Sequence, residues 1–364
     1  MSAKINLMLL YGGKSGEHEI SLVSAQAVLK HLNPARYHIM PVGMTKEGHL
    51  YLNDYQTLLT YTEALPVKTA QSRHLSSLVE DGSLVLNTDV VWPMVHGRLY
   101  EDGCLQGLLE LANVAYVGCD VMASAMGMDK DFARRVACVD GLLSAPYKVL
   151  NHTLSAQDQQ HICKLAVAQF GWPLFVKPCS SGSSVGIHKV HNLDELAYAV
   201  ADAFKFDHTI LIEQAVKGRE LEVAILDNTA DIAHPLVSCV GEVVVTHQDG
   251  FYSYSAKYID HQTTELVIPA VGSKIMMQAV QDAALAVFKR LRCRGMARVD
   301  FFFDEQTQTL YFNEINTLPG FTPMSMFPLL WQAKNMDYAH LLDELIQLAQ
   351  MYHQKRQQLI THYS

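Results

Sequence analysis

Three apolar runs limit what the first third of this chain can fold into. "INLMLLYGG", "YHIMPVGM" and "DVVWPMVHG" show no alternation of apolar and polar residues, which is the pattern of parallel strands that are buried on both faces. Segments with helical spacing, "EHEISLVSAQAVLKHL" and "GCLQGLLELA", follow the first and third runs. Residues 1–125 are therefore predicted to form an α/β domain with an open parallel sheet, in which ligands bind where strand ends meet loops.

The pattern changes from about residue 126. "WPLFVKPCSSGSSVGIHKV" predicts a hairpin with a Ser/Gly loop, and "TILIEQAV", "RELEVAIL", "ARVDFFFD" and "TLYFNEIN" predict further strands. Helices are predicted near residues 275–292 and 338–360. Residues 246–264 are rich in tyrosine and polar side chains without a regular period, so this segment is predicted to be a lid loop.

Size and charge narrow the class of protein. A chain of 364 residues favours two or three domains with clefts between them. The 28 basic and 37 acidic residues give a net charge of −9, which argues against nucleic acid as a partner.

Cysteine usage and hydropathy indicate the compartment. The seven cysteines are scattered and none forms a Cys-x-x-Cys pair, so neither a disulfide framework nor a thiolate zinc site is expected. No run approaches the ~20 apolar residues of a membrane span, and the N-terminal run is too short for a signal peptide. We therefore expect a cytoplasmic protein without a membrane partner.

The loop after the first apolar run resembles part of a phosphate-binding motif. It contains Gly13-Lys14-Ser15, but the glycine required five positions earlier is replaced by Met8. Two carboxylates, Glu17 and Glu19, follow where an anion site would disfavour negative charge. The phosphate-binding motif is therefore incomplete, and the two carboxylates make a cationic group the alternative ligand of this loop.

Two later stretches carry groups suited to phosphates and metal ions. Lys177 precedes the Ser/Gly hairpin loop, whose amides would cover a triphosphate; the alternative is a tight hairpin with a solvated lysine. Asp300, Glu314 and Asn316 lie near the ends of two strands joined by a turn, and the last two share one strand face. Oxygen ligands of this kind suit Mg²⁺ bridged to phosphates, the alternative being a solvated strand face.

Eight ordered motifs then carry a resemblance to a known family. They are "GGKSGEHEISL", "HGRLYEDG", "GCLQGLLELANVAYVGCD", "MDK", "KPCSSGSSVGI", "YSAKY", "ARVDFF" and "NEINTLPGFTPMS". Their order and spacing from Gly12 to Ser325 resemble the D-alanine:D-alanine ligases of the ATP-grasp superfamily. The resemblance implies an N-terminal substrate-binding domain (1–125) and a two-subdomain α+β clamp (126–213 and 214–364) whose lid is residues 246–264.

The resemblance also implies a reaction and its partners. ATP phosphorylates the carboxylate of one D-alanine, and the amine of a second D-alanine attacks the acylphosphate to give D-alanyl-D-alanine for peptidoglycan precursors. Two Mg²⁺ or Mn²⁺ ions and a homodimer are implied as well. Three alternatives stay open: D-serine or D-lactate as the second substrate, a non-catalytic nucleotide-binding protein, and another carboxylate–amine ligase.

Specific residues follow from the matched motifs. ATP is implied to meet Lys130, Lys177, Glu213, Val216, Glu220 and Lys257, and the metal ions Asp300, Glu314 and Asn316. Arg298 and the Gly320 N–H are implied to stabilise the oxyanion, while Ser325 binds the carboxylate of the second D-alanine. His96 and Glu17 are implied to be substrate-binding, with Glu17, Ser183 and Tyr258 forming a triad that orients the first D-alanine and selects the second. The family usually has glycine where Tyr100 stands, and this departure bears on the turn from Arg98 to Asp102 and on the neighbouring Glu101.

Overall fold

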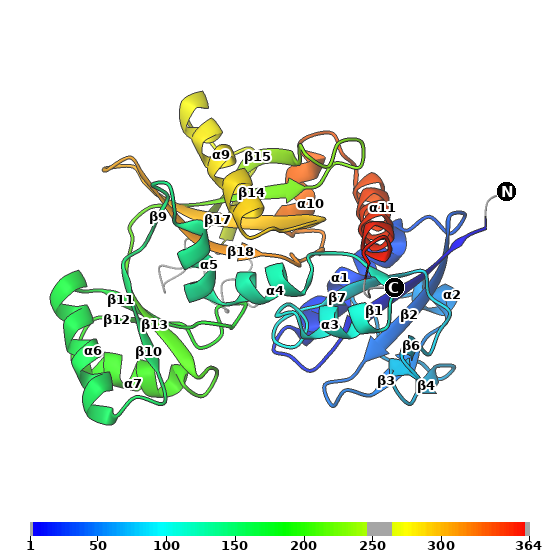
Figure 1. Ribbon diagram of the computed structural model, residues 1–364, viewed down its shortest axis with the longest axis horizontal. Coiled ribbons are helices and arrows are strands. Elements are labelled where there is room, and N and C mark those ends of the chain that lie inside the picture. The colour runs from blue at the N-terminus through cyan, green and yellow to red at the C-terminus, as the bar shows by residue number, and fades with distance from the viewer. Residues whose placement is uncertain (1–2, 246–263, 361–364) are drawn as a thin grey trace.

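In the described part of the chain, three large sheets and one small two-stranded sheet organise the molecule, and the large ones are built mainly from successive parts of the chain (Figure 1). The computed structural model describes residues 3–245 and 264–360. The predicted α/β class with a parallel N-terminal sheet and a following clamp is confirmed. The predicted lid at 246–264 lies outside the described residues, apart from Thr264.

The N-terminal sheet has the strand order β4-β3-β2-β1-β7-β8. Its central strands pair in parallel, as their uninterrupted apolar sequence predicted, whereas the short edge strands β3 and β4 pair antiparallel. The elements of this region are β1 (Ile5–Gly12), α1 (His18–His31), β2 (Tyr37–Met44), β3 (Leu50–Leu52), α2 (Tyr55–Leu58), β4 (Arg73–Leu75), β5 (Val79–Glu80), β6 (Ser83–Leu84), β7 (Val90–Val95), α3 (Cys104–Leu111) and β8 (Ala115–Tyr116).

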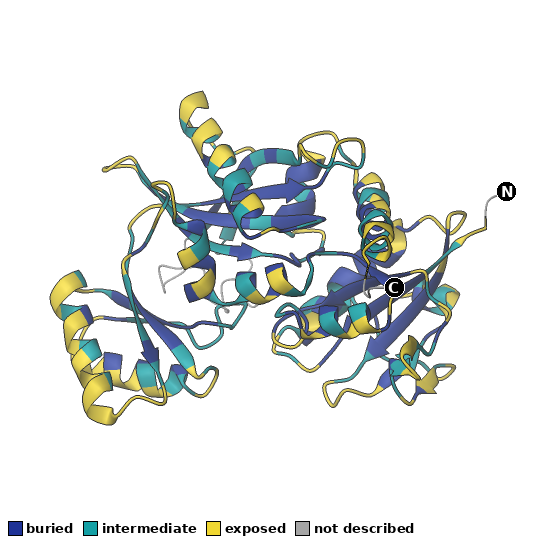
Figure 2. Cartoon of the chain, in the orientation of Figure 1, coloured by how far each residue is buried: buried dark blue, intermediate teal, exposed yellow. Residues whose placement is uncertain are grey.

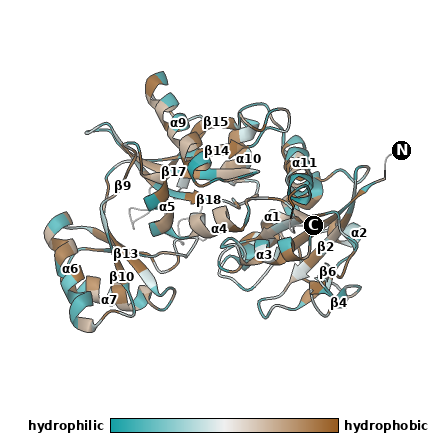
Figure 3. Ribbon diagram, in the orientation of Figure 1, coloured by the Kyte–Doolittle hydropathy of each residue, from teal (hydrophilic) through white to brown (hydrophobic). Residues whose placement is uncertain are grey.

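The central sheet is antiparallel, with the order β10-β13-β11-β12. The predicted Ser/Gly hairpin is confirmed, since β11 and β12 pair across it. Helices α6 and α7 pack on the sheet and keep their exposed, hydrophilic sides outward (Figures 2 and 3). The elements are β10 (Tyr147–Asn151), α6 (Ala156–Phe170), β11 (Leu174–Pro178), β12 (His188–Val190), α7 (Leu193–Ala203) and β13 (Thr209–Gln214).

The C-terminal sheet has the order β16-β15-β14-β17-β18-β9. Alternate residues of β14 face opposite helices: Val223 packs with α9, whereas Ala224 packs with α10. The elements are β14 (Arg219–Leu226), β15 (Leu236–Val245), β16 (Thr264–Val267), α9 (Lys274–Arg290), β17 (Met296–Asp304), β18 (Thr309–Asn316), α10 (Met326–Gln332) and α11 (Tyr338–Gln357).

Two segments pack away from their neighbours in sequence. Helices α4 (Val121–Met128) and α5 (Lys130–Ala137) lie on β18, and β9 (Leu143–Ser144) pairs with β18, so this stretch joins the C-terminal sheet. Helix α11 packs against β7, β8 and α1 of the N-terminal domain. The domain limits at 125 and 213 stay a prediction, because the stretch from α4 to β9 and helix α11 each pack against a sheet that lies outside the predicted domain containing them.

Within the described residues, we find no helix with the length and apolar character that crossing a membrane requires.

Candidate active site

The first loop after β1 is shaped by two glycines with positive φ. Gly12 and Gly13 have φ of 89° and 98°, a region that side chains with a Cβ rarely occupy. A Cβ on Gly12 would also lie 2.3 Å from the Met44 carbonyl oxygen. The tight turn leads into Glu17, which stands at the N-cap of α1 without making a side-chain capping bond.

The Glu17 carboxylate lies between the N-terminal domain and the Ser/Gly hairpin loop. It accepts a hydrogen bond from the Ser183 hydroxyl, a contact that spans 166 positions of the sequence. A Cβ on Gly97 would come within 3.1 Å of Glu17 Oε2, and one on Gly182 within 3.0 Å. These two glycines therefore leave room for the carboxylate where the loops carrying Glu17 and Ser183 meet.

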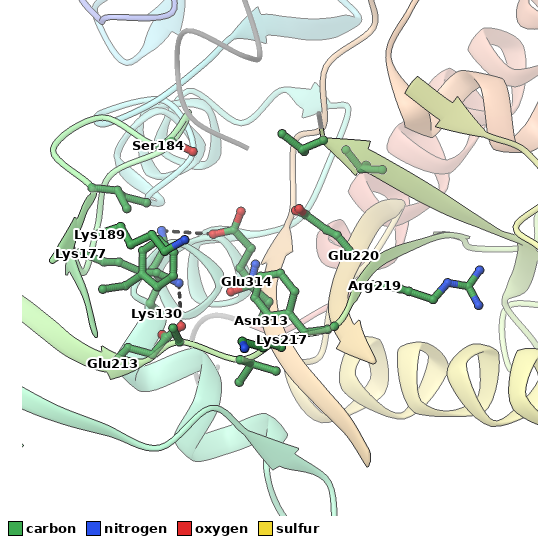
Figure 4. A pocket seen from close by; sticks show the side chains of 18 of the residues that line it. Lys130, Lys177, Ser184, Lys189, Glu213, Lys217, Arg219, Glu220, Asn313 and Glu314 are labelled. Carbon is green, nitrogen blue, oxygen red and sulfur yellow. Dashed lines mark hydrogen bonds and ion pairs between the residues drawn. The ribbon is translucent and has the colours of Figure 1, made fainter. Parts of the chain in front are cut away.

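A cavity of about 530 Å³ lies where the central and C-terminal sheets face each other. Lysines and carboxylates converge on it, as Figure 4 shows. Six of the residues implied to handle ATP or metal line it: Lys130, Lys177, Glu213, Val216, Glu220 and Glu314. Ser183 also lines the cavity and Lys14 does not.

A buried carboxylate between two cations forms the floor of this cavity. Glu213 Oε1 lies 2.7 Å from Lys177 Nζ, and its Oε2 lies 2.5 Å from Arg134 Nη1. The side chains of Glu213, Lys177 and Arg134 are 3%, 9% and 1% exposed, respectively. The guanidinium of Arg134 also lies 5.2 Å from the centre of the Tyr147 ring. Such contacts hold the Lys177 ammonium at a defined place in the cavity wall.

Burial and charge act in opposite directions on this cluster. Burial alone would raise the pKa of Glu213, but the cations of Arg134 and Lys177 outweigh it, so the pKa lies below its usual value. The pKa of Lys177 is lowered, because burial and the nearby Arg134 cation oppose its charge more than Glu213 supports it. An anionic ligand beside Lys177 would favour the charged lysine.

Lys130, which also lines the cavity, connects the hairpin loop with β18. It begins α5, and its Nζ donates to the Ser181 carbonyl at 2.8 Å and lies 3.2 Å from Glu314 Oε2. The Asp129 side chain caps the helix by accepting from the N–H groups of Asp131 and Phe132. The "MDK" motif thus places one lysine between the hairpin loop and β18.

Three adjacent strands of the C-terminal sheet turn charged residues to one face. Arg298 Nε and Nη2 each lie 2.8 Å from an oxygen of Asp300, and Nε lies 2.8 Å from Glu222 Oε2. The Asn316 amide donates to Asp300 Oδ2 at 2.9 Å. Burial works against the charge of Arg298, but Asp300 and Glu222 outweigh it and its pKa lies well above the usual value. Arg298 is therefore an anchored cation and not a surface salt bridge.

A bulge in β18 decides which of its side chains reach this face. Asp300 pairs with Glu314 while Phe301 pairs with Phe312, so Asn313 is the extra residue. Simple alternation would put Phe312 and Glu314 on the same face. The bulge instead leaves Phe312 in the apolar core and turns Glu314 to the cavity.

The chemistry of Asp300, Glu314 and Asn316 fits a hard divalent cation. Their side-chain oxygens lie on neighbouring strands, since Asp300 is opposite Glu314 in the register and hydrogen-bonded to Asn316. Asp300 is 2% exposed, which suits a buried ligand of Mg²⁺. Among the described residues no three His, Cys, Asp or Glu side chains cluster as a metal site; this set consists of two carboxylates and one amide.

The loop before α10 brings Gly320 and Ser325 together. A Cβ on Gly320 would lie 3.0 Å from Ser325 Oγ, so glycine leaves this close approach free of crowding. Ser325 occupies the N-cap of α10, but its hydroxyl accepts from the Thr322 N–H at 2.9 Å and makes no capping bond to the helix. A plain capping role does not account for this hydroxyl.

His96 is buried at the end of β7, next to the Glu17 loop. Its Nδ1 lies 3.4 Å from Glu101 Oε1, and Glu101 Oε2 accepts from the Gly97 N–H at 2.8 Å. Burial would lower the pKa of His96, but Glu101 and Glu17 outweigh this effect and the pKa is raised. The "HGRLYEDG" turn is thus fixed by Glu101, despite the tyrosine at position 100.

Two charged residues of the site were not predicted from the sequence, and two predicted residues lie outside the described part of the chain. Arg134 and Glu222 complete the two ion-pair clusters. Glu222 stands among the apolar residues of "RELEVAIL", a place where a charge is buried only when paired, whereas the polar sequence around Arg134 gives no such signal. Lys257 and Tyr258 lie outside the described residues, so their roles stay predictions.

Comparisons with known proteins show which family the chain resembles. Residues 6–119 match the family model described as the D-ala D-ala ligase N-terminus, and residues 137–347 match that of the C-terminus. The "D-alanine--D-alanine ligase" of Legionella pneumophila (strain Corby) is 56% identical over 363 residues, covering 100% of both chains.

Two solved structures also resemble this one. The D-alanine-D-alanine ligase from Coxiella burnetii superposes with a TM-score of 0.82 at 35% identity, covering 97% of this chain and 96% of that one. The VanG D-Ala:D-Ser ligase from Enterococcus faecalis has a TM-score of 0.82 at 30% identity, covering 95% and 100%. The chain belongs to the D-alanine–D-alanine ligase family.

Proposed function

We propose that this protein joins two D-alanine molecules in an ATP-dependent reaction, producing D-alanyl-D-alanine, ADP and phosphate for peptidoglycan synthesis. The observation that carries the proposal is the meeting of Glu17 with Ser183 beside the cavity lined by Lys130 and Lys177. An amino-acid site and a polyphosphate site that share one loop are what phosphorylation of an amino-acid carboxylate requires.

ATP occupies the cavity in this proposal. Lys130 and Lys177 neutralise its phosphates, and Lys257 joins them from the lid. Glu220 takes the ribose hydroxyls, while the backbone from Glu213 to Val216 meets adenine. Support comes from the convergence of the described members of this set on one cavity.

Divalent metal is proposed on the C-terminal sheet. Asp300, Glu314 and Asn316 would hold two Mg²⁺ or Mn²⁺ ions, supported by their oxygen donors on adjacent strands. Bound there, the ions would neutralise charge on the phosphates during transfer.

The chain's own residues then handle the amino acids. The Glu17 carboxylate, oriented by Ser183, holds the ammonium group of the first D-alanine, with His96 close to the same loop. A carboxylate oxygen of that D-alanine bonds to the γ-phosphorus as ADP leaves. The neutral amine of the second D-alanine attacks the acyl carbon and releases a proton to water as the amide forms, and phosphate leaves with the oxygen it gained.

Charge that develops on the acyl oxygen needs donors already in place. Arg298 and the Gly320 N–H are proposed to supply them, and Arg298 is suited because Asp300 and Glu222 fix its guanidinium. Ser325 is proposed to hold the carboxylate of the second D-alanine, since its hydroxyl is turned away from capping α10.

D-alanine is proposed over D-serine or D-lactate as the second substrate. Tyr258 follows Ala256-Lys257 in the lid and is proposed to link Glu17 and Ser183 when the lid closes. Replacement of Tyr258 by phenylalanine should then raise the use of D-lactate relative to D-alanine. An unchanged ratio would contradict the proposed triad.

One assay tests the proposed reaction. Phosphate release from ATP with Mg²⁺ is followed with D-alanine alone and with D-alanine plus D-serine or D-lactate, across a range of pH. We expect release that requires D-alanine and yields the dipeptide. Strong D-lactate use near neutral pH would contradict the choice of second substrate, and release independent of any D-amino acid would contradict the reaction. The homodimer and the cytoplasmic location stay predictions; sedimentation of the purified protein tests the first.

A further inference from the structure

Tyr100 lies between two parts of the N-terminal domain, the loop after β1 that leads to Glu17 and the end of β2. It is 6% exposed and sits in the turn between β7 and α3. Its hydroxyl accepts from the Lys14 N–H at 2.8 Å and lies 3.2 Å from Met44 Sδ, to which it donates. One hydroxyl thus connects the loop after β1 with the end of β2.

The ring of Tyr100 restrains the same loop by contact. A Cβ placed on Gly13 would lie 2.9 Å from two of its ring carbons, Cε2 and Cζ. The ring therefore covers Gly13 closely, and the backbone there has the left-handed φ of 98° that favours glycine. Packing and hydrogen bonding act on consecutive residues, Gly13 and Lys14.

The backbone of Tyr100 is itself held by hydrogen bonds. Its N–H donates to the Gly97 carbonyl at 3.1 Å, and its carbonyl accepts from Nε2 of the buried Gln106 at 2.8 Å. The adjacent Glu101 accepts from the Gly97 N–H at 2.8 Å. The aromatic side chain is therefore presented from a fixed turn, which is what a positioning residue requires.

The restraint reaches the amino-acid site through the short stretch from Lys14 to Glu17. Glu17 meets Ser183 in a space bounded closely by Gly97 and Gly182, so a displacement of this loop would misplace the carboxylate. We propose that Tyr100 positions the Glu17 loop and thereby tunes binding of the first D-alanine; this inference rests on the proposed function. Tyr100 acts through Lys14 and Glu17 and is not a catalytic residue.

Tyr100→Phe tests this with a small change, because it keeps the ring and removes the hydroxyl. The matched control is Tyr116→Phe, which also removes a buried hydroxyl from the same domain. The Tyr116 hydroxyl donates to Glu110 Oε1 and accepts from Arg294 Nη2, each at 2.8 Å. Rates are measured against D-alanine concentration and fitted with separate constants for the two amino-acid sites, and the KM for ATP is measured alongside.

We expect the KM for the first D-alanine to rise about two- to tenfold in Tyr100→Phe, the effect of losing one hydrogen bond. The KM for ATP should change by less than about twofold. Hydrogen exchange of the Lys14 amide should accelerate in Tyr100→Phe by about the same factor as the rise in the KM for the first D-alanine. Tyr116→Phe should change neither this KM nor the exchange rate of the Lys14 amide. Tyr100→Leu, which also removes the ring contact with Gly13, should show a larger rise in the same constant.

Unchanged D-alanine binding in Tyr100→Phe would overturn the inference, as would an equal rise in the KM for ATP. An equal effect in Tyr116→Phe would also overturn it, because loss of domain stability would then explain the change. If the unaltered protein makes no dipeptide, the proposed function fails instead, and the Lys14 exchange rate still tests the contact on its own.

Discussion

Replacement of Glu213 by glutamine should destabilise the protein strongly, because it removes the one negative charge between two buried cations. The carboxylate oxygens lie 2.7 Å from Lys177 Nζ and 2.5 Å from Arg134 Nη1. Glutamine keeps the shape but offers one acceptor oxygen in place of two. Its NH₂ group would face a cation that is also a donor.

The magnitude follows from burial. All three side chains are less than one tenth exposed, so water does not replace the lost partner. Breaking a buried pair by removing one member costs about 3–5 kcal/mol. At about 2–4 °C for each kcal/mol in a cooperative unit of 150–250 residues, the Tm should fall by at least about 6 °C.

The assay is thermal unfolding followed by circular dichroism, with Glu305→Gln as the matched control. Glu305 also pairs with an arginine, Arg219, but at 3.5 Å and with a side chain 64% exposed. Exposed pairs contribute about 0.2–1 kcal/mol, so at the same conversion the control should lose no more than about 4 °C. If Glu213→Gln lost no more than Glu305→Gln, the buried cluster would not have the energetic role assigned to it.

Three further predictions concern other parts of the site. Arg298→Lys should lower kcat at least about 100-fold, because a point charge replaces the fixed donor fork of the guanidinium. In the same steady-state measurements the KM for ATP should stay within about threefold of the value for the unaltered protein. A near-normal kcat would contradict the role of Arg298. Lys130→Met should raise the KM for ATP about ten- to hundredfold, the effect of losing a charged hydrogen bond, and an unchanged KM would remove it from the phosphate site. The raised pKa of His96 means that its pairing with Glu101 stabilises the fold fully below the unfolded pKa of about 6.5 and is lost as pH rises through the folded pKa. The Tm difference between the unaltered protein and His96→Asn should therefore be larger at pH 5.5 than at pH 8.5, and the reverse order would contradict this assignment.

Much of the architecture follows from local patterns in the sequence. Unbroken apolar runs identified the parallel strands β1, β2 and β7, and the Ser/Gly loop between two strands identified the hairpin of β11 and β12. The spacing of two residues between Arg298 and Asp300 is that of side chains on one strand face, and the two form a bidentate pair. These features depend on near neighbours, which is why the sequence alone indicates them.

Features that depend on distant partners were harder to predict. Arg134 has no motif that marks it, and its role emerges only when α5 brings it to Glu213. The bulge at Asn313 reverses the face on which β18 presents Glu314, and nothing in "TLYFNEIN" signals an extra residue. Similarly, β9 and α5 join the C-terminal sheet although the chain continues directly into the central one.

The fate of the carboxylate oxygens of D-alanine tests the central proposal most directly. D-Alanine labelled with ¹⁸O in its carboxylate is incubated with the protein, ATP and Mg²⁺, and the released phosphate is analysed by mass spectrometry. Transfer through a D-alanyl phosphate predicts one ¹⁸O in each phosphate, because the oxygen that attacks the γ-phosphorus leaves with it. Dipeptide formation with unlabelled phosphate would contradict the account.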